Sequence, residues 1–362
     1  MQYVPVVDKE STPLMPTTPA RARRWVKTRR ATPFWNKGVW CVRLNDEPSG
    51  RETQPVAVGI DPGSKREALV VATERKTLLN VQAQAVTRVK DAVTTRREMR
   101  RARRFRKTPY RQCRPNRRRR EAFLPPSTKA RWQWKLRLLA WLSKMYPLTH
   151  IMVEDVAATT KKGARRWNGL FSPLEQGKRF FYAEAARYGN VFPVPAYEVA
   201  ETRGQLGLKK SGDKMAERWD AHCVDGWTLT RLAFEAGVFE PTDTRLLCVA
   251  PIRLHRRQLH MLQSAKGGVR KPYGGTRSCG FTRGSYIAHP RYGTCYVGGT
   301  MNGKISLHAI TTGKRLTQGA RSDDCRHRAY ASWRWWRAAA AAHRTSRPHS
   351  SHGFSRGSPG RL

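Results

Sequence analysis

The sequence predicts an α/β protein with a smaller part at each end. Strand-like apolar runs alternate with helix-length segments between residues 56 and 236, a basic, Pro-punctuated stretch precedes them, and short β-like runs separated by Gly pairs follow them. The 362 residues include 70 Lys and Arg against 26 Asp and Glu, a formal net charge of +44. A charge of this size favours a polyanionic partner and excludes a generic metabolic enzyme.

The N-terminal residues predict a small module that contacts phosphate, because Pro13-Leu14-Met15-Pro16 is followed by a cluster of cations that includes Arg21, Arg23 and Arg24. The apolar runs at residues 56–60, 68–72 and 78–85 then predict three antiparallel strands. A turn at Asp61-Pro62-Gly63-Ser64 follows the first of these strands. The sequence therefore predicts a three-stranded meander that begins just before Asp61.

Residues 96–120 contain 13 Arg, one Lys and a single acid, Glu98. Solvated helix faces normally mix both signs of charge, so this run predicts a helix that binds nucleic acid. Apolar residues at helical spacing from Trp134 to Met145 predict a second helix, packed on the sheet. The cations expected to contact nucleic acid in the first helix are Arg96, Arg97, Arg100, Arg101, Arg103, Arg104, Arg106, Lys107, Arg111, Arg114, Arg117 and Arg118.

The later part of the chain predicts one more strand, a long helix and a separate β domain. Residues 150–156 form a buried-strand pattern that ends on acids, and residues 214–236 predict a helix closed by Gly237. From residue 249, short β runs and the Asn302-Gly303 hairpin signal predict a small all-β domain that extends to residue 336. Residues 337–362 have no periodicity and predict a disordered basic tail.

The seven cysteines are scattered and form no Cys-x-x-Cys pair, so we expect reduced thiols and no zinc site. No apolar window of membrane-spanning length occurs, so we expect no membrane contact. The expected location is the cytoplasm of a prokaryotic cell.

Three acids are candidates for catalysis: Asp61 after the first strand, Glu154 at the end of a later strand, and Asp220 on the last helix. Hydrolysis of a phosphodiester by two metal ions needs carboxylates from different elements, because the ions lie about 3.5–4 Å apart. We therefore expect two Mg²⁺ ions, for which Mn²⁺ can substitute, with these acids as ligands. Their order along the chain is typical of an RNase H-like nuclease fold.

The segments around these acids resemble the three motifs of RuvC-type nucleases. They read Gly59-Ile60-Asp61-Pro62-Gly63-Ser64, Ile151-Met152-Val153-Glu154-Asp155 and Trp219-Asp220-Ala221-His222-Cys223-Val224. The Arg-rich run resembles the bridge helix of CRISPR type II effectors and their transposon-encoded ancestors. Pro13-Leu14-Met15-Pro16 is similar to the motif that names the PLMP domain of the IscB and IsrB families.

The resemblance points to IsrB rather than IscB. IscB proteins carry an HNH nuclease between the second and third RuvC motifs. Here 65 residues separate Glu154 from Asp220, and no His lies between His150 and His222, so the HNH site cannot be built. Among RNA-guided relatives, the TnpB family ends in a zinc ribbon, which the cysteine spacing excludes.

The resemblance to IsrB implies an RNA-guided nickase bound to a noncoding guide RNA called ωRNA. Such a protein holds an RNA–DNA heteroduplex and cuts only the non-target strand of double-stranded DNA, as a monomer in a ribonucleoprotein. The implied divisions are a PLMP domain at 1–54, RuvC segments at 55–90, 123–200 and 201–248, a bridge helix at 91–122, a β domain at 249–336 that reads a target-adjacent motif, and a tail at 337–362. Candidates for reading that motif are Arg256, Arg257, Arg270, Lys271, Arg277 and Arg283.

The third acid stays open. Asp220 fits the family pattern Asp-Ala-x-x-Val, but Glu217 then stands where relatives carry a His three residues before the last Asp. Either Glu217 replaces that His as a ligand or base, or Asp225 and His222 form the third motif instead. We favour Asp220 on the sequence alone.

Two other functions remain open on the sequence alone. One is a structure-selective DNA nuclease or transposase of the same fold that works without RNA and cuts branched DNA by itself. The other is a basic RNA-binding protein without catalytic activity, which Mg²⁺-dependent cleavage would exclude.

Overall fold

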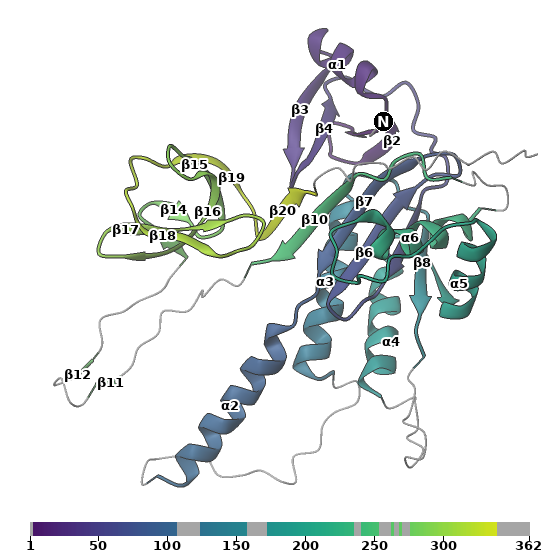
Figure 1. Ribbon diagram of the computed structural model, residues 1–362. Helices are drawn as coiled ribbons and strands as arrows, with labels where there is room; N and C mark the ends of the chain where they lie inside the picture. The colour runs from purple at the N-terminus through teal and green to yellow at the C-terminus, as the bar shows by residue number, and fades with distance from the viewer. Residues whose placement is uncertain are drawn as a thin grey trace, which may run out of the picture.

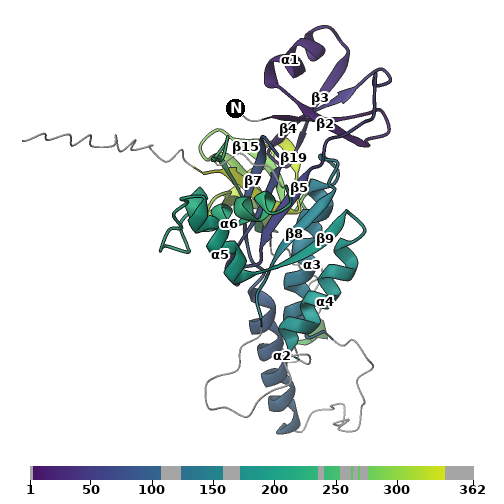
Figure 2. The ribbon, with the colours of Figure 1, turned by 90° about the vertical axis from the view of Figure 1, so that its right-hand side faces the viewer.

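A mixed α/β core with a central seven-stranded sheet forms the body of the protein (Figure 1). The computed structural model describes residues 3–106, 124–157, 172–234, 240–252, 262–263, 268–269 and 276–338. Helices α3 (Pro126–Leu142) and α4 (Pro173–Ala185) cover one face of the sheet, and α5 (Ala196–Gln205) and α6 (Trp219–Arg231) cover the other (Figure 2). The strands, in spatial order, are β20 (Trp333–Arg337), β10 (Leu246–Pro251), β7 (Thr77–Gln84), β6 (Arg66–Ala72), β5 (Ala57–Asp61), β8 (His150–Asp155) and β9 (Asn190–Pro195).

The predicted meander is confirmed: β5, β6 and β7 pair antiparallel in chain order. Strand β8 pairs parallel with β5, with Ile60 opposite Val153, and β9 pairs parallel with β8. Because parallel strands end at the same edge of a sheet, the last residues of β5 and β8 are neighbours. This pairing places Asp61 and Glu154 at one edge.

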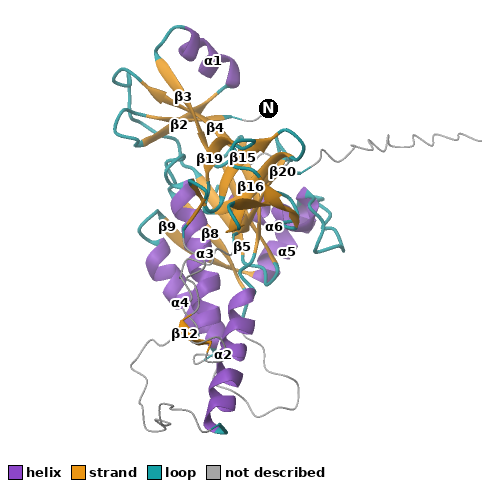
Figure 3. Cartoon of the chain, turned by 90° about the vertical axis from the view of Figure 1, so that its left-hand side faces the viewer, coloured by secondary structure: helices purple, strands orange, loops and turns teal. Residues whose placement is uncertain are grey.

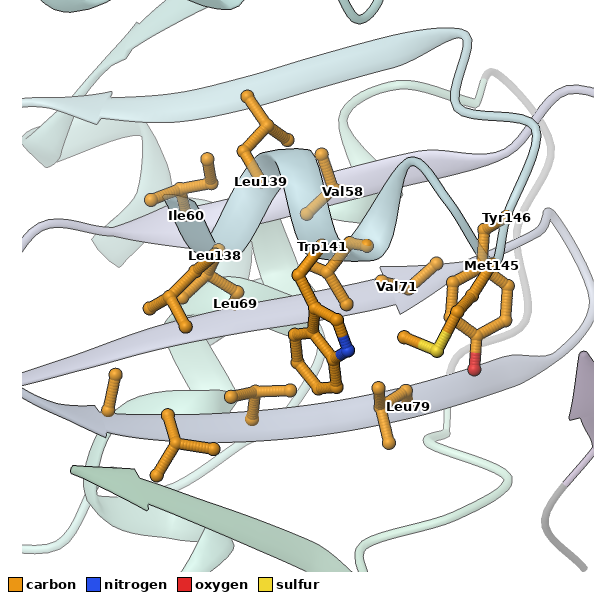
Figure 4. Close-up of a cluster of buried hydrophobic side chains, with 14 of the residues drawn as sticks. Val58, Ile60, Leu69, Val71, Leu79, Leu138, Leu139, Trp141, Met145 and Tyr146 are labelled. Carbon is orange, nitrogen blue, oxygen red and sulfur yellow. The ribbon is translucent and has the colours of Figure 1, made fainter. Parts of the chain in front are cut away.

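The largest core lies between the sheet and α3 (Figure 4). Leu138, Leu139 and Trp141 of α3 are buried against Ile60 and Leu69 of the sheet. The prediction that this helical stripe packs as core is confirmed. The apolar area it removes from water is the main source of stability for the sheet.

A buried ion pair crosses the same face of the sheet. Lys135 Nζ of α3 lies 3.2 Å from Glu67 Oε1 of β6, with 3% and 0% of the two side chains exposed. Burial raises the pKa of Glu67, and the Lys135 ammonium opposes that rise.

We expect Glu67→Gln to lower the free energy of unfolding by about 3 kcal/mol, because it leaves a buried ammonium without its counterion. The double change of Glu67→Leu with Lys135→Met should recover most of that loss, since apolar residues of similar volume replace both charges. Urea unfolding of the two variants measures the difference. Equal destabilisation of both would show that the charge pair is not the cause.

The N-terminal module is a four-stranded sheet with one helix, and residues 13–16 of the predicted motif lie in its strand β2. It consists of β1 (Val4–Val7), β2 (Pro13–Thr17), α1 (Pro19–Lys27), β3 (Ala31–Asn36) and β4 (Val39–Leu44), in the spatial order β2-β1-β4-β3. Thr18 caps α1 by accepting a hydrogen bond from the Arg21 amide, and Pro19 occupies the first turn. The module contacts the body where Trp141 Nε1 donates to Asn36 Oδ1 at 3.0 Å.

The Arg-rich helix α2 (Arg88–Arg104) starts earlier than residue 96 and projects from the body at the end opposite to the N-terminal module (Figures 1 and 3). The remainder of the predicted run, residues 107–120, lies outside the described residues. None of the helices in the described ranges has the length and apolar composition needed to cross a membrane.

Two predictions about the second half were wrong. The helix expected over residues 214–236 begins only at Trp219, because Arg218 is extended, with φ −130° and ψ 150°. The expected boundary at residue 249 falls inside β10, which pairs parallel with β7. Strand β20 then returns to pair antiparallel with β10, so both ends of the predicted β domain belong to the central sheet.

Between β10 and β20 the chain forms a five-stranded sheet with its own small core (Figure 1). Its spatial order is β18 (Arg315–Ala320), β17 (Lys304–Ala309), β16 (Gly293–Met301), β15 (Ser285–His289) and β19 (Arg326–Tyr330). Two short hairpins precede it, formed by β11 (Leu262–Gln263) with β12 (Gly268–Val269) and by β13 (Arg277–Ser278) with β14 (Phe281–Thr282). The described residues between β10 and β20 thus contain strands and no helix, as the sequence predicts.

Candidate nuclease centre

Asp61 is the last residue of β5, and its side chain is buried beneath α6. Only 6% of the residue is exposed. Its Oδ2 lies 2.9 Å from Nδ1 of His222, which comes from α6. A carboxylate at this depth needs a partner, and the imidazole supplies one.

Glu154 reaches the same place from β8. Its pKa is raised to about 8, first by burial and then by the negative charges of Asp61 and Asp225, against the opposing charge of Lys210. Like charges close together resist simultaneous ionisation, and the contributions of Asp61 and Asp225 to this shift place both acids near Glu154. We call Asp61, Glu154 and Asp225 the carboxylate cluster.

Helix α6 contributes both Asp225 and His222, which are three residues apart and therefore share one helix face. Asp225 is 1% exposed and accepts hydrogen bonds from Arg203 and Lys210. The two cations hold the carboxylate of Asp225 in place and offset its charge.

The close approach of α6 to β5 depends on two glycines that face each other. A Cβ atom on Gly59 would lie 1.9 Å from the carbonyl oxygen of Gly226. A Cβ atom on Gly226 would be 3.0 Å from a methyl group of Val70. Only two residues without side chains allow the helix to lie this close to the strand.

The other two candidates for the third motif, Asp220 and Glu217, have partners outside the carboxylate cluster. The Asp220 side chain is 29% exposed and pairs with Arg218, whose Nε lies 3.1 Å from Asp220 Oδ1. Glu217 accepts a hydrogen bond from Trp336 Nε1 at 2.8 Å and lies 3.4 Å from Arg66 Nη2. The residues that the fold brings together are therefore Asp61, Glu154, Asp225 and His222.

The imidazole ring of His222 has a hydrogen-bond partner at each of its two nitrogens, and one of these partners is Asp61. Nε2 lies 2.9 Å from the carbonyl oxygen of Lys214, while Nδ1 faces Asp61. Burial disfavours the charged ring, but the Asp61 carboxylate and the Lys214 carbonyl together raise the pKa of His222. Because both neighbours accept hydrogen bonds, the protonated ring satisfies this arrangement best.

The sequence contained a signal for this third motif. In the RuvC-type motif that this segment resembles, a His lies three residues before the last Asp, and His222 stands three residues before Asp225. Glu217 occupies the corresponding position before Asp220. The spacing thus favours the same pair that the fold places beside Asp61.

The chemistry of the carboxylate cluster fits a hard divalent cation. Among the described residues, no three His, Cys, Asp or Glu side chains form a ready-made metal-binding group. Mg²⁺, however, commonly uses only one or two protein carboxylates and completes its shell with water and phosphate oxygens. Asp61 and Glu154 offer such a pair, and a bound cation would offset the repulsion from Asp61 that contributes, after burial, to the raised pKa of Glu154.

The predicted nucleic-acid contacts fall partly on described residues. Most of the predicted contacts in α2 have exposed side chains: Arg96, Arg97, Arg100, Arg101 and Arg104. The side chain of Arg106, just after α2, is also exposed. In α1 the exposed side chains are those of Arg21, Arg23 and Arg24. Arg103 lies in the helix. Lys107, Arg111, Arg114, Arg117 and Arg118 are outside the described ranges, as are the motif-reading candidates Arg256, Arg257, Arg270 and Lys271. Arg277 is exposed on β13, and Arg283 follows β14.

No curated protein matches this chain. Among solved structures it is similar to RuvC of T. thermophilus in complex with a Holliday junction substrate, at 15% sequence identity and a TM-score of 0.27, over 49% of this chain and 96% of that one. Residues 4–168, which include Asp61 and Glu154, match the family model described as RRXRR protein.

Proposed function

We propose that this chain is an RNA-guided DNA endonuclease with one RuvC-type centre, which nicks the non-target strand of double-stranded DNA. The observation that carries the nuclease assignment is the meeting of Asp61, Glu154 and Asp225 from β5, β8 and α6. The strand order β7-β6-β5-β8-β9, with the first three antiparallel and the rest parallel, supports an RNase H-like fold for this part.

We assign two Mg²⁺ ions to this centre, held by the carboxylate cluster. Bound metal would supply charge stabilisation at the scissile phosphate and an activated water. The chain itself contributes orientation: His222 fixes Asp61, while Arg203 and Lys210 fix Asp225. Helix α6 covers this face of the sheet and limits the access of bulk water to Asp61.

The charge distribution supports a long polyanionic partner. Helix α2 projects away from the body, and its arginines from Arg96 to Arg104 are accompanied in that stretch by one acid, Glu98. Arginines that contact phosphate groups hold a duplex by its backbone, and the sequence is then read by base pairing. Together with the PLMP-like and bridge-helix-like motifs, this favours a noncoding guide RNA and an RNA–DNA heteroduplex as partners.

The decisive experiment is a nicking assay with the ribonucleoprotein purified from cells that carry the gene with its native flanking DNA. We expect one long RNA to copurify and, with Mg²⁺, to direct conversion of a matching supercoiled plasmid to the open circle. Protein freed of RNA should leave the plasmid intact. Cleavage of branched DNA by protein alone would instead assign the chain to structure-selective nucleases or transposases.

A further inference from the structure

The N-terminal module contains a pocket of about 180 Å³ that the proposed nuclease centre does not use. Leu14, Trp25 and Leu44 form apolar walls, and Asp46, Glu47 and Glu52 line the pocket with them. Residues from β1, β2, α1 and β4 line the pocket together with the segment that follows β4. The module itself lies at the opposite end of the molecule from α2 (Figure 1).

The charges around this pocket are unusual for this chain. Only 26 of its 362 residues are acids, yet three of them line one small pocket. Arg30 also lines the pocket, and the helix that supplies Trp25 presents a row of exposed cations to solvent. These are Arg21, Arg23, Arg24 and Lys27, with Arg29 just after the helix. A ligand that fits both features carries hydrogen-bond donors at one end and negative charge at the other.

The acidic side of the pocket is fixed by an ion pair. Arg51 pairs with the buried Asp8, which follows β1, and its Nη2 lies 3.2 Å from Glu47 Oε2. Its guanidinium thereby ties the segment after β4 to the sheet, and it engages one carboxylate oxygen of Glu47. Asp46 and Glu52 form no ion pair with any other described residue, and both are exposed at the pocket. Their carboxylates can accept hydrogen bonds from a ligand.

We propose that this pocket binds one unpaired guanine of a single-stranded RNA. A purine ring can stack on the Trp25 indole, as bases do on aromatic side chains in single-strand binding. Among the four bases only guanine presents two adjacent donors, N1–H and the 2-amino group, on its Watson–Crick edge. Carboxylates accept hydrogen bonds and cannot donate them, so the acids select guanine and disfavour adenine and cytosine, whose ring nitrogen is an acceptor.

The surrounding cations favour a nucleotide over a basic peptide. The phosphates that flank the base can contact Arg30 and the arginines of α1. A cationic peptide would gain from Asp46 and Glu52 but would be repelled by these arginines. The inference extends beyond the proposed function, because the pocket would hold the base whether or not the chain cuts DNA.

The test is fluorescence anisotropy with the full chain, freed of nucleic acid by a high-salt wash, and labelled heptamers that differ only at the central base. We expect U₃GU₃ to bind about tenfold tighter than U₇. Inosine at the centre, which lacks the 2-amino group, should lose part of that preference. The variant Asp46→Asn with Glu52→Gln should bind U₃GU₃ and U₇ equally, and Trp25→Leu should weaken the preference.

Glu74→Gln is the matched control, because it removes one exposed acid on the hairpin between β6 and β7, away from the pocket. It should keep the full preference for guanine. Equal binding of U₃GU₃ and U₇ by the unchanged protein would overturn the proposal, as would a guanine preference that survives the loss of both acids. The same measurement with the DNA heptamers T₃GT₃ and T₇ is a further control, and a guanine preference that appears in DNA but not in RNA would overturn the assignment to RNA. Acid-dependent binding of a peptide of residues 343–362, without any guanine preference, would assign the pocket to a basic peptide.

Discussion

We expect Asp225→Asn to lower the rate of DNA cleavage by about a hundredfold or more, while Asp220→Asn cleaves at nearly the normal rate. Asp225 is buried and its charge acts on Glu154, whereas Asp220 pairs with Arg218 near the surface. Removing a carboxylate from the cluster weakens the hold on a divalent cation, and removing a partly exposed one does not. Single-turnover nicking of a supercoiled plasmid measures both rates.

The control for this prediction concerns folding. Asp225→Asn strands the cations of Arg203 and Lys210 beside a neutral amide, which can lower stability by itself. Adding Lys210→Met removes one stranded cation, so the double variant should regain thermal stability and stay inactive. If instead Asp220→Asn is inactive at a normal melting temperature and Asp225→Asn is active, the third acid is Asp220 and the proposed cluster is wrong.

Much of the central sheet could be predicted because its strands are consecutive in the chain. The meander of β5, β6 and β7 pairs neighbours through short turns, and each strand has its own apolar run. The outer strands could not be predicted in this way. Strand β20 pairs with β10 across the whole five-stranded sheet, and local periodicity carries no information about such a distant partner.

The site could be predicted only in part, for a reason that lies in α6. Asp61 and Glu154 stand at the ends of apolar runs, where parallel strands bring them together. Helix α6, however, is buried at every position from Ala221 to Arg231, so no polar face indicates which side meets the sheet. The spacing of His222 and Asp225 favoured Asp225, but the face of α6 that meets the sheet is set by a tertiary contact, the crossing of Gly59 and Gly226, that hydrophobic periodicity does not contain.

The same crossing leads to the second large expected effect. Gly59→Ala should lower the free energy of unfolding by about 3 kcal/mol or more and abolish cleavage. Its new Cβ would lie 1.9 Å from a backbone oxygen of α6 and 2.9 Å from Leu229 Cβ, so the helix has to move away from β5. That movement carries Asp225 and His222 away from Asp61. Urea unfolding and the nicking assay measure the two losses.

Two other glycines make this prediction specific. Gly226→Ala should be milder, because its Cβ would lie 3.0 Å from a Val70 methyl group and 3.3 Å from the Gly59 carbonyl oxygen, both looser contacts than the 1.9 Å at Gly59. Gly204→Ala in α5 meets nothing within 4 Å and should raise stability by about 0.5–1 kcal/mol, since alanine restricts the unfolded chain and favours the helix. The expected order of stability is thus Gly204→Ala, then the unchanged protein, then Gly226→Ala, then Gly59→Ala. Normal stability and cleavage in Gly59→Ala would show that α6 does not lie on β5 as described, and the grouping of Asp225 with Asp61 and Glu154 would fail with it.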